Sequence, residues 1–152
     1  MNLVTRLACI ASLAVAGVAG AAPQEAGEAP ATAWDQAKVT ALAGELSAAV
    51  KGIRTAVRQT GSPSIGSMQS RHFHQFKDKL RLIESESRHL ASELAEGQGL
   101  EPTLPAYRHL RLLVRDAREL ARSLFIGKQT QDRIDVGRAK LDALAAYYPP
   151  EK

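Results

Sequence analysis

The residues of this sequence that could do chemistry are arginines and histidines in its second half. Residues 107–125 read YRHLRLLVRDARELARSLF, in which arginines recur at alternating steps of three and four. Such steps return to one side of an α-helix, so five guanidinium groups form a single row. This row, the arginine stripe, consists of Arg108, Arg111, Arg115, Arg118 and Arg122. Guanidinium groups hold phosphates and carboxylates by paired hydrogen bonds, so the stripe suits an anionic partner.

The same spacing is also typical of a solvated helix face. Glu119 stands at helical spacing from Arg115 and Arg122, and the apolar stems of arginines cover surface well. Exposed ion pairs of this kind contribute only about 0 to 1 kcal/mol each. Two interpretations of the stripe therefore stay open, a docking surface for an anion and a plain solvated face.

Histidines give a second hypothesis, of a different class. Glu86 and His89 have the Glu-x-x-His spacing of di-iron bundles, but such a site needs two copies and one is present. If their helices run antiparallel, His89, Glu93 and His109 lie at one level and could bind zinc or copper. The alternative function is thus a small metal or cofactor carrier, and the competing interpretation is that these are solvated side chains.

No resident cofactor and no enzymatic activity are predicted. The one cysteine is Cys9, so the chain beyond residue 21 has no thiol for covalent haem or for a thiolate metal site. The four histidines lie within residues 72–109, which leaves the first and last predicted helices without one. No nucleophile stands beside a base, and no glycine-rich phosphate loop follows a strand.

Residues 1–21 are typical of a secretory signal peptide. Arg6 precedes the apolar run LACIASLAVAGVA, and Ala19 and Ala21 are the small residues that a cleavage site needs. The run is too short for a membrane anchor, which requires about 20 apolar residues. We expect a mature chain that begins at Ala22, has no transmembrane anchor, and is exported to the periplasm or secreted.

Downstream of the cleavage site, the sequence predicts a short leader and one helical domain. Residues 22–31 are rich in alanine, proline and glutamate and cannot bury enough apolar surface to fold. From residue 32 to residue 148, apolar residues recur every three or four positions, as in amphipathic helices. Glycines and prolines interrupt this pattern three times. The helices are predicted at about residues 33–60, 67–96, 104–126 and 130–148.

Four amphipathic helices joined by short loops favour an all-α, up-down-up-down four-helix bundle. Thr32 is the predicted cap of the first helix, and Pro105 is placed in the first turn of the third. Ser87 interrupts the apolar row of the second helix, where its hydroxyl is expected to bond a carbonyl of its own helix. The predicted buried positions are Val39, Leu42, Leu46, Ala49, Ile53, Ala56, Phe73, Phe76, Leu80, Ile83, Leu90, Leu94, Ala106, Leu110, Leu113, Ala117, Leu120, Leu124, Ile134, Gly137, Leu141, Leu144 and Tyr148. Heptad positions place the arginine stripe on the outer face, opposite Leu110, Leu113 and Leu120.

The distribution of charge points to the same helix. The chain carries a net charge of +4, and removal of residues 1–21 takes away Arg6 alone. Residues 103–126 contain the five arginines of the stripe against Asp116 and Glu119, so their surplus equals that of the whole mature chain. Outside the cytoplasm the anionic partners on offer are acidic proteins, envelope polymers and lipids, whereas nucleic acid is a poor candidate. The two longer helices could also overhang the shorter pair and form a homodimer surface.

Overall fold

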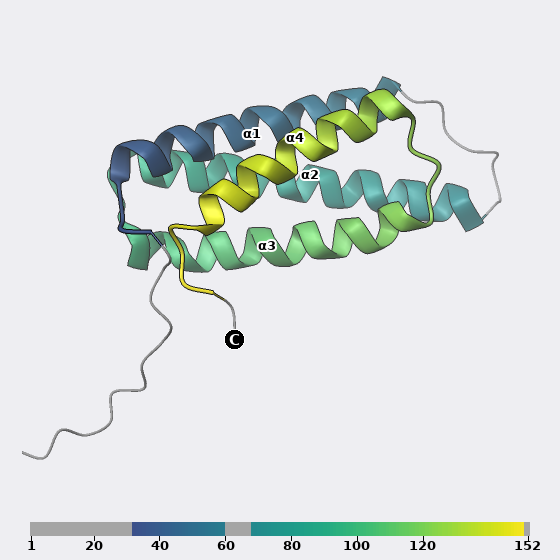
Figure 1. The fold of residues 1–152 in the computed structure, drawn as a ribbon. Coiled ribbons are helices and arrows are strands. Elements are labelled where there is room, and N and C mark those ends of the chain that lie inside the picture. Colours follow the sequence, from purple (N-terminus) through teal and green to yellow (C-terminus); the bar gives the residue numbers. More distant parts are fainter. Residues whose placement is uncertain (1–31, 60–67, 151–152) are drawn as a thin grey trace, which may run out of the picture.

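The structure is a computed structural model that describes residues 32–59 and 68–150. The signal peptide and the leader predicted at residues 1–21 and 22–31 lie outside the described residues. The described part contains four α-helices and no strand, which confirms the all-α, four-helix prediction (Figure 1). The helices are α1 (Gln36–Gln59), α2 (Met68–Ala95), α3 (Leu100–Arg122) and α4 (Lys128–Ala145).

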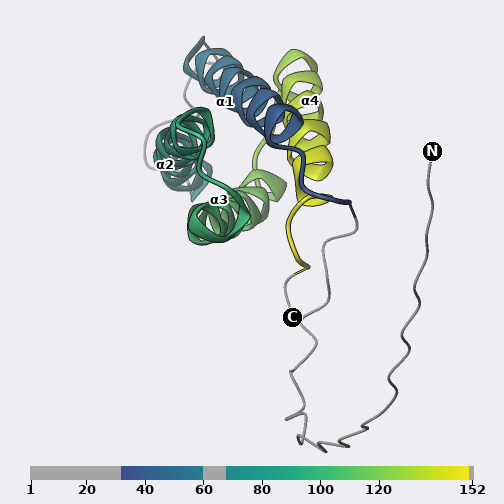
Figure 2. The same ribbon diagram turned by 90° about the vertical axis from the view of Figure 1, so that its left-hand side faces the viewer.

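The four helices alternate in direction along the chain, but they do not close into a ring. α1 packs against α2 on one side and against α4 on the other, and α2 packs against α3. Between the described helices α3 and α4 there is no comparably close approach of the backbones. Figure 2 shows this along the helices, with α4 beside α1 and α3 beside α2. The domain is therefore a four-helix arrangement that is open along one side.

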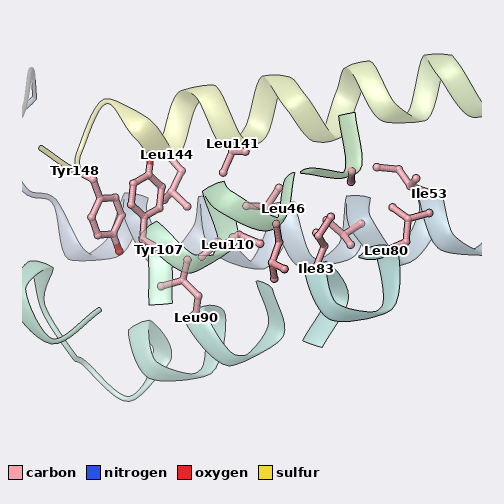
Figure 3. Packing of buried hydrophobic residues seen from close by; sticks show 14 of the residues in the cluster. Leu46, Ile53, Leu80, Ile83, Leu90, Tyr107, Leu110, Leu141, Leu144 and Tyr148 are labelled. Atoms are coloured by element: carbon pink, nitrogen blue, oxygen red, sulfur yellow. The ribbon is translucent and has the colours of Figure 1, made fainter. Parts of the chain in front are cut away.

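One apolar core lies between the helices, built from the predicted three-and-four rows (Figure 3). Most of the predicted positions are buried. The half-buried ones are Leu42, Ala49, Ala106, Leu120, Leu124 and Ile134. Full burial of a leucine, isoleucine, valine or phenylalanine side chain contributes about 1.5–3 kcal/mol. The most completely buried large side chains are Tyr107, Tyr148, Leu90, Leu94, Leu110, Leu144 and Val39.

Ser87 behaves as its position in the apolar row predicts. The side chain is buried, and its hydroxyl donates to the Glu84 carbonyl of the same helix at 3.1 Å. A buried hydroxyl without a partner would destabilise the fold, so this local bond allows a serine inside the core.

The start of α1 corrects the predicted cap. Asp35, and not Thr32, is the capping residue, because its Oδ1 accepts the backbone N–H of Lys38 at 3.1 Å. That backbone hydrogen bond is the main cause of a lowered pKa of the Asp35 carboxyl. The backbone N–H of Thr32 instead donates to the Ala146 carbonyl at 3.0 Å, which ties the entry of α1 to the end of α4.

α3 begins at Leu100, four residues before the predicted start at residue 104. Pro102, and not Pro105, occupies the first turn, where an amide has no partner within the helix. Pro105 lies inside the helix, and α3 continues through it. The buried Thr103 side chain stabilises this turn by donating to the Gly99 carbonyl at 2.8 Å.

α4 lies close against α1 because two glycines face the contact. A Cβ atom on Gly137 would lie 3.0 Å from Ile53 Cδ1, and one on Gly52 would lie 3.2 Å from Arg133 Nη1. Real Cβ atoms are rarely found so close to a neighbour, so Gly137 sets the distance between the two helices. α4 is therefore positioned by α1 and not by α3.

Candidate functional site

A groove with a volume of about 630 Å³ runs between α3 and α4, where the helical ring is open. Its floor comes from α1 and α2, whose side chains there are only 3 to 6% exposed. The floor residues are Leu46, Val50, Ile53, Phe76, Leu80 and Ile83. Because these side chains belong to the core, the groove reaches down to the apolar interior while remaining narrow at its base.

The α3 wall of the groove carries most of the arginine stripe. The stripe residues that line it are Arg111, Arg115, Arg118 and Arg122. The stripe was predicted to lie on the outer face, away from the other helices; instead it borders the apolar face of α3 on the α4 side. Arg108 is exposed one turn earlier and is not among the lining residues.

The other flank of α3 is occupied by α2, which explains why the stripe meets open space. Lys79 of α2 donates to Asp116 Oδ2 at 2.9 Å, and this hydrogen bond is the main cause of a lowered pKa of the Asp116 carboxyl. α3 is thus fastened to α2 through its acidic flank. Its basic flank faces α4 across the groove without packing against it.

The arginines of the stripe differ in what they contact. Arg111 is half-buried, and its Nη1 donates to the Tyr107 hydroxyl at 3.2 Å while the guanidinium lies over that ring. Arg122 pairs with Glu119 at 2.8 Å, as the spacing predicted. Arg108, Arg115 and Arg118 form no ion pair with any described residue.

The α4 wall is apolar at its base and carries mixed charge at its edge. Ile134 and Leu141 face the groove, and Asp135, Arg138 and Asp142 lie above them. Both carboxylates have partners on their own helix. Asp135 accepts from Gln131 at 3.1 Å, and Asp142 lies 3.7 Å from Arg138 Nε. The rim as a whole holds five arginines and two aspartates, so it carries an excess of positive charge.

Aromatic side chains join α3 to the end of the chain beyond one end of the groove. The rings of Tyr107 and Tyr148 stack with centroids 3.9 Å apart (Figure 3). Trp34 meets Tyr148 edge-on, with ring centroids 5.5 Å apart. The Tyr148 hydroxyl lies 2.9 Å from Thr103 Oγ1, and burial raises the pKa of Tyr148 to about 12. At the other end the groove is bounded by Leu124 and Ile126 of the loop between α3 and α4.

The three candidate metal ligands are divided between two contacts. His89 Nε2 lies 3.4 Å from Glu93 Oε1 on α2, and His109 Nδ1 lies 3.3 Å from Glu86 Oε1 across the α2–α3 interface. Within residues 32–59 and 68–150, no three histidine, cysteine or carboxylate side chains are grouped as metal ligands would be. As predicted, His109 of α3 lies beside the C-terminal half of α2. It contacts Glu86 there, and not His89 and Glu93.

Two exposed apolar side chains near the stripe were missed from the sequence. Leu112 is 43% exposed and lines the groove, and Phe125 is 92% exposed in the loop that follows α3. A signal for Leu112 was present, since it falls between Leu110 and Leu113 and out of phase with the buried row. Single exposed apolar residues are common on protein surfaces, so Leu112 is of interest because it lines the groove.

None of the four described helices is both long enough and apolar enough to cross a lipid bilayer. No protein-family model matches the chain, and the comparisons with curated proteins and with solved structures found no significant similarity.

Proposed function

We propose that the protein is exported to the cell envelope or secreted, and that it binds an anionic molecule through the arginine stripe of α3 without catalysing a reaction. The observation that carries this proposal is the position of Arg115 and Arg118. Both lie on the rim of an open groove, and neither has an ion-pair partner among the described residues. Their guanidinium groups can therefore donate hydrogen bonds to a carboxylate or a phosphate.

Charge at the contacts between helices is arranged differently. Where helices meet, cations are paired: Arg54 of α1 with Glu84 of α2, and Lys79 of α2 with Asp116 of α3. Such pairs neutralise one another and leave little field at the surface. Along the stripe, Arg108, Arg115 and Arg118 have no ion-pair partner among the described residues. Arg115 and Arg118 line the groove, and charges of one sign that line a hollow reinforce each other.

The metal-carrier alternative has less support. It requires His89, Glu93 and His109 to converge, whereas each histidine contacts a different glutamate. The stripe, in contrast, needs no rearrangement to present its guanidinium groups.

Sedimentation with anionic vesicles tests the proposal. The exported protein is mixed with vesicles of phosphatidylglycerol and, in parallel, of phosphatidylcholine. The stripe variant carries Arg108→Gln, Arg115→Gln and Arg118→Gln, which leaves Arg111 on Tyr107 and Arg122 on Glu119. The parent is expected to bind the anionic vesicles alone, with affinity falling as salt is added, because salt screens exposed charges beyond about 8 to 10 Å at physiological ionic strength.

The matched control removes the same charge from elsewhere. Arg71, Arg81 and Arg88 of α2 are exposed, make no ion pair among the described residues and do not line the groove. Their replacement by glutamine is expected to leave most of the binding intact, whereas the stripe variant loses it. Equal losses in the two variants would mean that net charge alone matters, and an absence of binding at low salt would refute the proposal.

Export is tested separately by intact-mass measurement on material from the medium or the periplasm. We expect a mass that corresponds to a chain beginning at Ala22, because Ala19 and Ala21 provide the small residues that signal peptidase requires. A protein that stays in the cytoplasm with residues 1–21 attached would contradict this part of the proposal.

A further inference from the structure

We propose that the groove between α3 and α4 binds a fatty-acid anion, with the hydrocarbon chain in the groove and the carboxylate on the arginine stripe. This inference rests on the proposed function and names the class of ligand. It is carried by the combination of an apolar floor, a volume within the range of small-molecule sites and a basic rim on the α3 wall.

The apolar surface of the groove comes first. Val114 and Ala121 of α3 and Ile134 and Leu141 of α4 line the groove on opposite sides above the core residues of its floor. In a closed bundle these rows would cover each other, but α3 and α4 do not pack together. A hydrocarbon chain between them would remove apolar surface on both walls from water, which favours binding in proportion to the area covered.

The dimensions limit what can lie there. The volume of about 630 Å³ falls within the range of small-molecule sites, about 300–1,000 Å³. The α3 wall from Arg111 to Arg122 covers eleven residue-to-residue steps, a length of about 16 Å. A helix with its side chains is about 10–12 Å across, too wide to reach floor residues that are only 3 to 6% exposed. An unbranched hydrocarbon chain is much narrower than a helix, so it can lie between the two walls above that floor.

Side chains near its two ends limit the length of the groove. Tyr107 and Tyr148 stack beyond one end, and Leu124 and Ile126 of the connecting loop bound the other. The ligand must therefore be of finite length, comparable to the α3 wall. A fatty-acid chain of medium length meets this condition.

The rim determines which head group is bound. Arg115 and Arg118 have no ion-pair partner in the described residues, so one carboxylate would gain two guanidinium neighbours. The carboxylates of the α4 wall, Asp135 and Asp142, are held by Gln131 and Arg138. The ligand's carboxylate is therefore expected on the α3 side of the rim, where a planar guanidinium matches its geometry.

Titration calorimetry with laurate tests the inference, at concentrations below those at which laurate forms micelles. Octanoate tests the effect of a shorter hydrocarbon chain. Dodecanol keeps the hydrocarbon chain without the charge, and acetate keeps the carboxylate without the long chain. We expect one laurate per protein and roughly fourfold weaker binding for each methylene removed. Dodecanol is expected to bind more weakly than laurate, and acetate not measurably.

Two variants distinguish the groove that holds the hydrocarbon chain from the arginines that bind the carboxylate. Ala121→Trp fills the groove and leaves every arginine in place, so it should abolish laurate binding while vesicle binding persists. Ala48→Trp is the matched control, because Ala48 is exposed on α1 and does not line the groove. Joint replacement of Arg115 and Arg118 by glutamine should weaken laurate at least tenfold and leave dodecanol unchanged, since charge-assisted hydrogen bonds contribute about 1.5–3 kcal/mol.

Photo-crosslinking provides a measurement on the unaltered protein, in case Ala121→Trp disturbs the fold. Laurate with a diazirine near its methyl end should label peptides that contain groove residues, and excess laurate should suppress this labelling. Labelling of other faces only, or laurate binding that survives Ala121→Trp in a folded protein, would overturn the inference. Vesicle binding by a parent protein that does not bind laurate would refute this inference and leave the proposed function standing.

Discussion

Tyr107 of α3 and Tyr148, which follows α4, stack with their ring centroids 3.9 Å apart and their planes inclined by 7°. The Tyr148 hydroxyl lies 2.9 Å from Thr103 Oγ1, which in turn donates to the Gly99 carbonyl. Thr103 has a single hydroxyl proton, so Tyr148 is the donor in the contact between the two hydroxyls. The end of the chain is thereby bound to the start of α3, although α3 and α4 themselves do not pack together.

Two substitutions of Tyr148 are expected to destabilise the fold to different extents. Tyr148→Phe keeps the stacked ring and loses one buried hydrogen bond, a loss of about 0.5–1.5 kcal/mol. Tyr148→Ala also removes the ring and should lower the free energy of unfolding by about 3–5 kcal/mol. Urea denaturation followed by circular dichroism measures both. Equal stabilities of the two variants would show that the ring contact contributes nothing.

The same residue predicts a loss of stability at high pH. Burial raises the pKa of Tyr148 to about 12 from an ordinary value of 10.0. Between these values the unfolded chain releases the proton and the folded chain retains it, so stability is complete below pH 10 and falls as the pH rises toward 12. The parent should lose more stability than Tyr148→Phe across this interval. Parallel pH profiles of the two proteins would contradict the prediction.

A charge in the core should destabilise the fold far more than the same charge on the exposed face of the same helix. Leu80 is 5% exposed and Leu82 is 46% exposed on the same helix. Leu80→Asp places an unpaired carboxylate in the core and should lower stability by several kcal/mol, whereas Leu82→Asp should change it by less than about 0.5 kcal/mol. Thermal melting compares the two. Similar melting temperatures for both variants would mean that the described core is wrong.

Substitution by alanine should have different effects on stability at Gly44 and at Gly137. Gly44 has nothing within 4 Å of an added Cβ, so Gly44→Ala should stabilise the helix by up to about 1 kcal/mol. An alanine Cβ at residue 137 meets Ile53 Cδ1 at 3.0 Å, so Gly137→Ala should gain less or destabilise the fold. Ile53→Val removes this methyl group. In a double-mutant cycle we therefore expect Gly137→Ala to cost less in the valine background than in the parent.

Zinc should leave the melting temperature unchanged. His89 and His109 contact different glutamates, and two ligands on each side do not make a tetrahedral site. A rise in melting temperature with zinc that disappears in His89→Ala or His109→Ala would instead favour the metal-carrier alternative, because a bound ion stabilises the folded state.

The period of the apolar residues predicted the four helices and most of the core, including Leu46, Leu80, Leu110 and Leu144. This works because the pitch of the α-helix sets the period, and burial of one face requires apolar residues at that period. Helix starts were less predictable. Asp35 and Thr32 are both suitable capping residues, and Pro102 and Pro105 are both suitable for a first helical turn, so local sequence preferences do not decide between them.

The groove could not be predicted in the same way. Periodicity identifies which face of α3 is apolar, but it does not say which helix covers that face. The outer placement of the arginine stripe assumed a closed bundle, in which the α4 side would be covered. The close approach of α4 to α1 at Gly137 moves α4 toward α1, and this contact joins residues far apart in the sequence. Its consequence, a basic wall beside open apolar surface, appears only in three dimensions.

The aromatic contacts at the start of α3 make the protein its own optical reporter. The chain has one tryptophan, Trp34, and its ring lies 5.5 Å from Tyr148 at an interplanar angle of 87°. Its indole N–H donates to the Gln36 side chain at 2.9 Å, so its surroundings are fixed from both sides. All tryptophan fluorescence therefore comes from the place where the chain end meets α3. Without any attached dye, the wavelength of that emission reports whether Tyr148 is seated.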